Sequence, residues 1–115
     1  MSQDVFVPIG NTVNLTPSAV SQSVQLPVPS PPLTYRYGVR VRNTSTEEVF
    51  IRFNTVAPTA NAATDIPIAA NSVEVIGVPD MPSHLQGTPV ATIFVAAIAA
   101  GAGSGPIYFT LGFGE

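Results

Sequence analysis

Hydrophobic and polar residues alternate along most of this chain, a pattern typical of half-buried β-strands. No segment shows a sustained 3.6-residue apolar period, and twelve prolines and nine glycines punctuate the sequence. The runs that qualify as strands, by alternation and by β-branched or aromatic content, are 5–7, 12–16, 20–26, 35–42, 48–53, 73–77, 90–98 and 107–111. Eight short strands in 115 residues predict an all-β, single-domain, jelly-roll-like β-sandwich.

Two of these runs, 35–42 and 48–53, are separated by five residues and are expected to form a hairpin. The predicted cross-strand pairs are Val41 with Val49, Val39 with Ile51 and Tyr37 with Phe53. In this register every odd-numbered residue faces one apolar side. The even-numbered side then carries all four basic residues of the chain, one aromatic and one acid: Arg36, Arg40, Arg42, Arg52, Phe50 and Glu48. Because arginine and aromatic residues are enriched at protein interfaces, this side is expected to be a docking face, the alternative being an ordinary solvated sheet face.

A second hairpin is expected from runs 90–98 and 107–111, in which small and large side chains alternate as in a packed core. Its predicted pairs are Ile98 with Ile107, Ala96 with Phe109 and Phe94 with Leu111. In the other runs, the residues expected to point toward the core are Val20, Val24, Leu26, Val73 and Val75, with Glu74 pointing out.

The N-terminal third is expected to differ from the rest. Residues 1–32 are interpreted as an extended arm, the first strands and a proline-rich spacer at 27–32, and residues 33–115 as the sandwich core of one overall domain. The arm at 2–16 has one charged residue, Asp4, and its Val5, Phe6 and Val7 are candidates for pairing with the sheet edge of a neighbouring molecule. Segment 57–70 is expected to cross between sheets, with a short helical turn near 60–63.

The composition favours an assembled protein. The chain has four arginines, no lysine and seven acidic residues, so 10% of its residues are charged, against roughly a quarter in a typical soluble domain. A surface so poor in charge favours association, and a homodimer or homotrimer is expected. The longest apolar stretch, 90–102, is shorter than the roughly 20 residues that span a bilayer, and the N-terminus lacks the pattern of a secretory signal. No membrane partner is expected.

Catalytic and cofactor chemistry is not predicted. The absence of cysteine excludes disulfides and thiolate metal sites, and a net charge of −3 argues against nucleic acid as a partner. Asp80, Ser83 and His84 lie together in one proline-flanked turn, whereas the members of a catalytic triad converge from distant parts of a fold. The glycine-rich segment 101–105 lacks the lysine of a phosphate-binding loop and is interpreted as a hairpin loop. The chain is therefore expected not to be an enzyme and to need no metal or cofactor.

Four stretches resemble a known family. They are VRVRNT at 39–44, VFIRF at 49–53, AANSVEV at 69–75 and, after an alanine-rich strand, IYFTLGFGE at 107–115. Together they are similar to small proteins encoded among the head genes of tailed bacteriophages, and the similarity covers roughly residues 39–115. The chain departs from that pattern at Leu111, where a proline is common, and in the longer loop at 77–89. The resemblance implies a capsid decoration, or cement, protein with a jelly-roll-like fold that clamps neighbouring major capsid subunits.

The expected function is therefore that of a structural virion protein, made in the host cytoplasm and bound to the capsid exterior, with the major capsid protein and further copies of itself as partners. The alternative is a tail or fibre adaptor or receptor-binding module whose loops contact a carbohydrate or a host protein. An enzyme or small-ligand carrier is the third class. The candidate interface residues are Arg36, Arg40, Arg42, Phe50 and Arg52, together with Val5, Phe6 and Val7.

Overall fold

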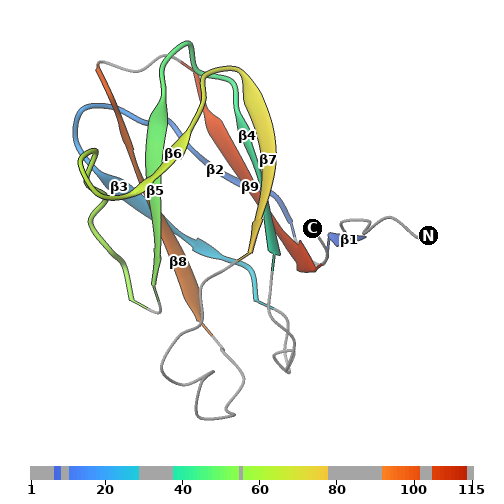
Figure 1. The fold of residues 1–115 in the computed structure, drawn as a ribbon. Coiled ribbons are helices and arrows are strands. Elements are labelled where there is room, and N and C mark those ends of the chain that lie inside the picture. Colours follow the sequence, from blue (N-terminus) through green and yellow to red (C-terminus); the bar gives the residue numbers. More distant parts are fainter. Residues whose placement is uncertain are drawn as a thin grey trace.

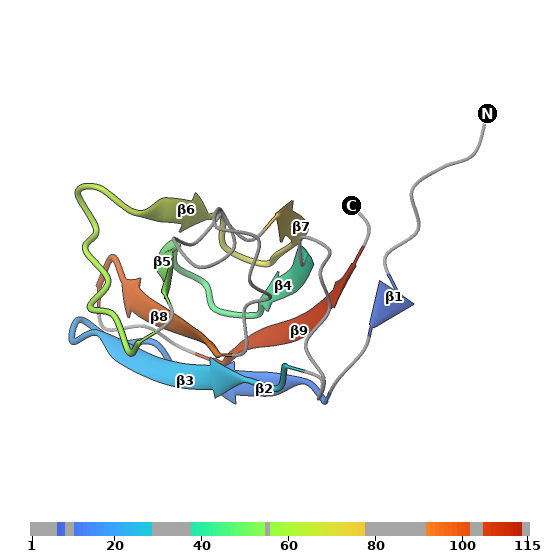
Figure 2. The ribbon, with the colours of Figure 1, turned by 90° about the horizontal axis from the view of Figure 1, so that it is seen from below.

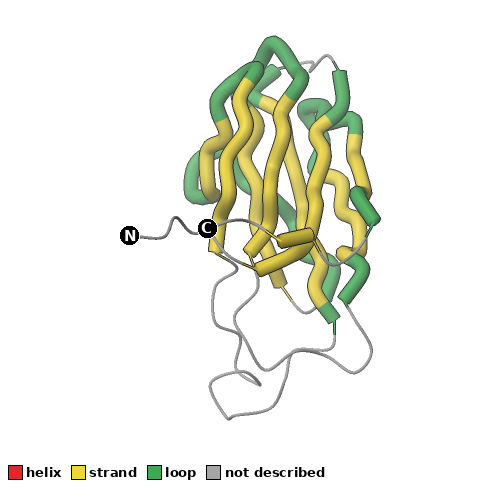
Figure 3. Tube along the Cα trace, turned by 90° about the vertical axis from the view of Figure 1, so that its right-hand side faces the viewer, coloured by secondary structure: helices red, strands yellow, loops and turns green. Residues whose placement is uncertain are grey.

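The computed structural model describes residues 7–8, 11–28, 38–54, 56–77, 92–101 and 105–113. Its strands are β1 (Val7–Pro8), β2 (Val13–Leu15), β3 (Gln22–Leu26), β4 (Gly38–Asn43), β5 (Val49–Asn54), β6 (Ile66–Ile68), β7 (Ser72–Gly77), β8 (Ile93–Ala99) and β9 (Ile107–Phe113). The described ranges consist of strands and loops (Figure 3). They include no helix long and apolar enough to cross a membrane.

The strands form two antiparallel sheets that face each other as layers (Figures 1 and 2). Sheet A has the order β1-β9-β4-β7, and β2 pairs with the same edge of β9 as β1 does. Sheet B has the order β3-β8-β5-β6. When β1 and β2 are counted as one position, the orders along the chain become 1-8-3-6 and 2-7-4-5, which is a jelly-roll arrangement. The predicted all-β jelly-roll-like sandwich is therefore confirmed.

Both predicted hairpins are wrong. Strand β4 lies in sheet A between β9 and β7, whereas β5 lies in sheet B between β8 and β6, so Val41 does not pair with Val49. Strands β8 and β9 likewise belong to different sheets, and Phe109 pairs with Val41 and Val13 instead of Ala96. The physical reason is that two strands on opposite sheets of a sandwich bury alternate residues against the same core, just as two paired strands do.

The core confirms the predicted inward face of the central strands. The largest fully buried hydrophobic side chains are Val39, Val41, Ile107, Phe109 and Leu111 from sheet A, and Leu26, Val49, Ile51, Ile68, Ile93 and Val95 from sheet B. Strand β8 thus contributes the odd-numbered Ile93, Val95 and Ala97 to the core cluster. The expected core contacts were the even-numbered Phe94, Ala96 and Ile98, of which only Ala96 is buried. The inward direction predicted for Val20 is also wrong, because this residue, which precedes β3, is 72% exposed.

The orientation predicted for run 73–77 is reversed. Val73 pairs with Arg42 and Val75 with Arg40, whereas Glu74 pairs with the buried Val41. Because residues directly opposite each other in an antiparallel pair share a face, both valines point outward. Strand β7 is an edge strand, so Glu74 remains exposed even though it lies on the inner face of the sheet. A charged residue can lie on the inner face here because β7 is at the edge of the sheet, and the sequence does not reveal which strands lie at an edge.

The N-terminal strands belong to the sandwich itself. Val13 and Leu15 of β2 pair with Phe109 and Ile107 of β9 and pack against the core. Leu26 of β3 is fully buried. The sandwich therefore begins well before residue 33, and residues 13–15 form an edge of the chain's own sheet, where they pair with β9. Only the first two residues of the predicted spacer, 27 and 28, lie within the described ranges.

Segment 57–70 leads from sheet B to sheet A as expected, but it crosses only at its end. It first connects β5 to β6 within sheet B, and residues 69–71 then lead to β7 in sheet A. Strand β6 was not predicted because Ile66–Ile68 is short and has Pro67 at its centre. Proline is tolerated there because β6 is an edge strand with only β5 as its partner. One helical turn is present, with the N–H groups of Thr64 and Asp65 donating to the carbonyl of Asn61. It lies about where the turn near 60–63 was expected.

Four of the crossings between sheets lie together at one end of the sandwich, here called the crossover end (residues 16–21, 44–48, 69–71, 100–101 and 105–106). Asn43, which is buried, donates from its side chain to the carbonyls of Glu47, Ile68 and Ala69 and accepts from the N–H of Ser45. Further hydrogen bonds join the same crossings, from Thr44 N to Pro106 O, Asn71 N to Ser45 O, Ala100 N to Glu48 O and Ala99 N to Ser18 O. The loop around 101–105 is thus one of these crossings and not the expected hairpin loop.

Candidate docking site on the outer face of sheet A

The structure separates the predicted interface residues. Arg40 and Arg42 are exposed on the outer face of sheet A, whereas Phe50 and Arg52 point outward from sheet B, on the opposite side of the molecule. Val7 lies in β1 and pairs with Phe113. Arg36, Val5 and Phe6 lie outside the described residues. The four arginines therefore do not share one face, although the outward direction predicted for Arg40, Arg42 and Arg52 is confirmed.

The outer face of sheet A is organised in rows that run across its strands. In one row Arg42 stands between Tyr108 of β9 and Val73 of β7, and Tyr108 is followed by Asn14 of β2. In the next row Arg40 stands between Thr110 and Val75. A third row holds only glycines on these strands: Gly38, Gly77 and Gly112. The two arginines are thus flanked by valines on one side and by an aromatic and a hydroxyl group on the other.

A cavity of about 160 Å³ opens beside the arginines and is lined by Thr12, Arg40, Arg42, Tyr108 and Thr110. The hydroxyls of Thr12 and Thr110 are hydrogen-bonded to each other at 2.7 Å, which fixes the wall of the cavity away from the arginines. A second cavity of about 180 Å³ lies on the crossover-end side of Arg42, with Asn71, Ser72 and Val73 in its lining. Arg42 therefore contributes to both.

The charged side chains that line these two cavities are both basic, Arg40 and Arg42. Among the described residues, neither Arg40 nor Arg42 forms an ion pair, and no acidic side chain lines either cavity. The whole chain has a net charge of −3, so this positive patch contrasts with the rest of the molecule. An exposed cation without an internal partner is free to bind an anion from outside, and arginine does so with a fork of several N–H donors.

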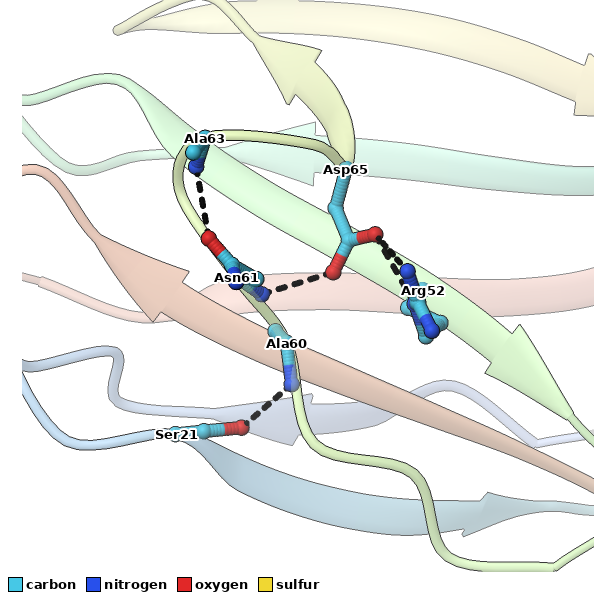
Figure 4. Close-up of polar contacts among 6 residues, drawn as sticks. All are labelled: Ser21, Arg52, Ala60, Asn61, Ala63 and Asp65. Atoms are coloured by element: carbon cyan, nitrogen blue, oxygen red, sulfur yellow. Dashed lines mark hydrogen bonds and ion pairs between the residues drawn. The ribbon is translucent and has the colours of Figure 1, made fainter.

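The outer face of sheet B is arranged differently. The Nε and Nη2 atoms of Arg52 donate to Oδ1 of Asp65 at 2.8 and 2.7 Å, while Asp65 Oδ2 accepts from the N–H of Asn61 at 2.6 Å (Figure 4). The Asp65 side chain is only 4% exposed. The N–H of Ala60 donates to the Ser21 hydroxyl at 2.8 Å, so the segment between β5 and β6 is tied to the residue just before β3. Arg52 thus helps to hold the segment between β5 and β6 against sheet B.

Phe50 is also placed unlike the expected anchor of an arginine cluster. It is half-buried on the outer face of sheet B, where Ile98 and Pro67 are its cross-strand neighbours. The aromatic residue that lies beside Arg42 is Tyr108. The sequence indicated that Tyr108 points outward, because Tyr108 and Thr110 alternate with the buried Ile107, Phe109 and Leu111. It did not indicate that Tyr108 lies beside Arg42, because β9 was expected to pair with residues 90–98 and not with β4.

Neither a protein-family model, nor a curated protein, nor a solved structure matches this chain. In the ranges that the structure describes, no group of three or more His, Cys, Asp or Glu side chains could hold a metal ion. Asp80, Ser83 and His84, the residues weighed as a triad, lie outside those ranges.

Proposed function

We propose that this protein is a structural virion protein that decorates the outside of a bacteriophage head and stabilises contacts between major capsid protein subunits. The observation that carries the proposal is the outer face of sheet A, where two exposed arginines without an ion-pair partner among the described residues stand between a tyrosine and two outward-pointing valines. The resemblance of residues 39–115 to proteins encoded among phage head genes supplies the biological setting.

The residue types on this face suit a protein partner. Interfaces are enriched in arginine and tyrosine at their centre, and Val73, a residue that is 51% exposed, adds apolar area beside them. The side chains project from paired strands in the middle of a sheet, so their spacing is fixed before a partner arrives. A site that is already ordered loses less conformational entropy on binding. The partner surface is expected to be acidic, because it must neutralise two arginines.

A low surface charge supports assembly in general, and self-association into a dimer or trimer remains a prediction. Sedimentation of the purified protein at tens of micromolar concentration tests it, since a strict monomer would contradict it. The chain's acidic net charge disfavours nucleic acid as the partner.

The alternative function is that of a phage tail or fibre adaptor or receptor-binding module. One observation favours it: jelly-roll sandwiches also occur in lectins, and the cavity at Tyr108 is polar, with hydroxyls and an aromatic ring that could contact a carbohydrate.

The location of the protein in the virion separates these two functions. Purified virions of the phage that encodes the chain are separated into heads and tails, and each fraction is probed with an antibody against the protein. Decoration predicts a signal on intact heads, with the protein accessible from outside. A signal confined to tails would favour the adaptor, and its absence from both fractions would exclude a virion component of either kind.

A further inference from the structure

We infer that the cavity between Arg40, Arg42 and Tyr108 takes a single carboxylate side chain, an aspartate or glutamate of the docking partner. The inference rests on the proposed function, because the partner is taken to be a protein. It deepens that function by naming the chemical group that is recognised and the residues that recognise it.

The lining of the cavity is dominated by hydrogen-bond donors. The two guanidinium groups have N–H donors and no acceptor, and the remaining lining residues, Thr12, Tyr108 and Thr110, carry hydroxyls. Because the Thr12 and Thr110 hydroxyls bond to each other at 2.7 Å, one proton of that pair is used and the other is left for a guest. A group placed here must therefore accept hydrogen bonds and favour positive surroundings, as an anion does.

The spacing of the arginines suits a small planar anion. Arg40 and Arg42 are two residues apart on the same face of β4, which places their Cα atoms about 6.8 Å from each other. Long side chains that start from these two points can converge on one carboxylate, with each guanidinium facing one oxygen. Tyr108, opposite Arg42, and Thr110, opposite Arg40, close the side toward β9.

The acids of this chain that the structure places elsewhere do not fill the cavity. Asp65 is engaged by Arg52 on sheet B, and Glu74 shares the inner face of sheet A with Val41. A nucleic acid fits less well than a protein, since its binding relies on many Lys or Arg contacts with phosphates, and this face offers two arginines in a chain of net charge −3. Two arginines instead match one carboxylate on a neighbouring protein.

The test uses the full-length protein in solution and a probe that presents one side-chain carboxylate, N-acetyl-glutamate α-amide. The probe is titrated at constant ionic strength, held with chloride, while the Nε–H signals of the arginines are followed by NMR. The signals of Arg40 and Arg42 should shift in a saturable way, and that of Arg52 should not. N-acetyl-glutamine α-amide, which has the same shape without the charge, should cause no saturable shift.

Two substitutions sharpen the result. Arg42→Ala should abolish saturation at Arg40, because the carboxylate then loses one of its two guanidinium partners. Arg42→Lys should keep part of the affinity, since the charge remains but the fork of donors is lost. Both side chains are exposed, so an unchanged spectrum elsewhere verifies that each variant is folded.

Several outcomes would overturn the inference, and the first is the absence of a saturable shift at Arg40 and Arg42. An equal shift with the glutamine probe would show that charge is not recognised, and an equal shift at Arg52 would show that binding is not local. Tighter binding of methyl phosphate than of the glutamate probe would assign the cavity to tetrahedral anions. These results are independent of the virion location: a protein that decorates heads but ignores the probe disproves the cavity alone, whereas a protein that binds the probe but is missing from virions disproves the function alone.

Discussion

The two outer faces of this sandwich both carry arginine, and they use it in opposite ways. On sheet B, Arg52 is held by the nearly buried carboxylate of Asp65, and a loop tied down by Ala60 and Ser21 lies over the same side. On sheet A, Arg40 and Arg42 stand beside an open cavity whose lining includes no acid from the described part of the chain. The same residue type in the same alternating pattern is thus structural on one face and available for binding on the other.

The difference has a topological cause. Among the described strands, β5 and β6 are the only successive pair that stays within one sheet, apart from β1 and β2 at their shared edge. The chain between β5 and β6 therefore folds back over sheet B and brings Asp65 to Arg52, thirteen residues away. Strand β4, in contrast, is followed by a crossing to the other sheet, so its own continuation supplies no acid to its outer face.

The largest expected effect is on binding through sheet A. The double substitution Arg40→Ala, Arg42→Ala should weaken attachment to undecorated heads by about 2–4 kcal/mol, or roughly 30- to 1,000-fold, because both cations of the face are lost. Stability should change by no more than about 0.5 kcal/mol, since both side chains are exposed. Occupancy measured over a concentration series gives the affinity. Arg52→Ala is the matched control, and an equal loss of binding in that variant would erase the distinction between the two faces.

The next largest effect concerns stability through sheet B. Asp65→Ala removes the acceptor of three hydrogen bonds and should lower the free energy of unfolding by about 1–3 kcal/mol. Denaturant unfolding measures this loss, and occupancy on heads should be unchanged at a temperature where the variant is folded. Weaker attachment of the folded variant would show that the loop over sheet B also contacts the capsid.

A smaller effect is expected from the hydroxyl group of Tyr108. Tyr108→Phe keeps the ring beside Arg42 and removes one donor from the cavity, so affinity for heads should fall by about 0.5–1.5 kcal/mol, or roughly 2- to 12-fold. Thr59→Val, a hydroxyl removal at an exposed position between β5 and β6, is the matched control for head binding. An unchanged affinity of Tyr108→Phe would mean that the tyrosine contributes only its ring.

The smallest effect is the response to salt. Raising the ionic strength from about 0.1 M to 1 M shortens the Debye length from about 10 Å to 3 Å, which screens the exposed arginines of sheet A more than the pair on sheet B. Affinity for heads should fall a few-fold, whereas the stability difference between wild type and Asp65→Ala should hardly change. A loss of that stability difference at high salt would mean that the Arg52–Asp65 pair is screened like an exposed charge.

The sequence predicted the layers of this fold better than its pairings. Alternation correctly placed Val39, Val41, Val49 and Ile51 inside and Arg40 outside, because burial on one face of a strand is a local property. Pairing is a non-local property, and a connection of five residues after Asn43 suits a hairpin as well as a crossing. The polar residues at that connection did not distinguish a hairpin from a crossing. Asn and Ser are common in turns, but here Asn43 and Ser45 are buried and hydrogen-bonded to each other at the crossing.

For the same reason, the direction of the site's arginines could be predicted but their neighbours could not. Arg40 and Arg42 were identified with their correct direction, yet the hairpin register assigned them Phe50 and Arg52 as companions. Their actual neighbours, Tyr108 and Thr110, come from a strand more than sixty residues later, with which β4 pairs. The Arg52–Asp65 pair was missed because nothing in a thirteen-residue spacing indicates that a loop returns over its own sheet.

The central position of β9 has a consequence for how the protein is made. This strand follows the other described strands along the chain, and it lies between β1 and β2 on one side and β4 on the other. Sheet A therefore cannot be completed during synthesis until residues 107–113 have left the ribosome, and folding must wait for contacts between distant parts of the chain, which is intrinsically slow. A chain truncated before residue 107 lacks the strand that joins the two halves of the sheet, so only copies that contain β9 can present the arginine face.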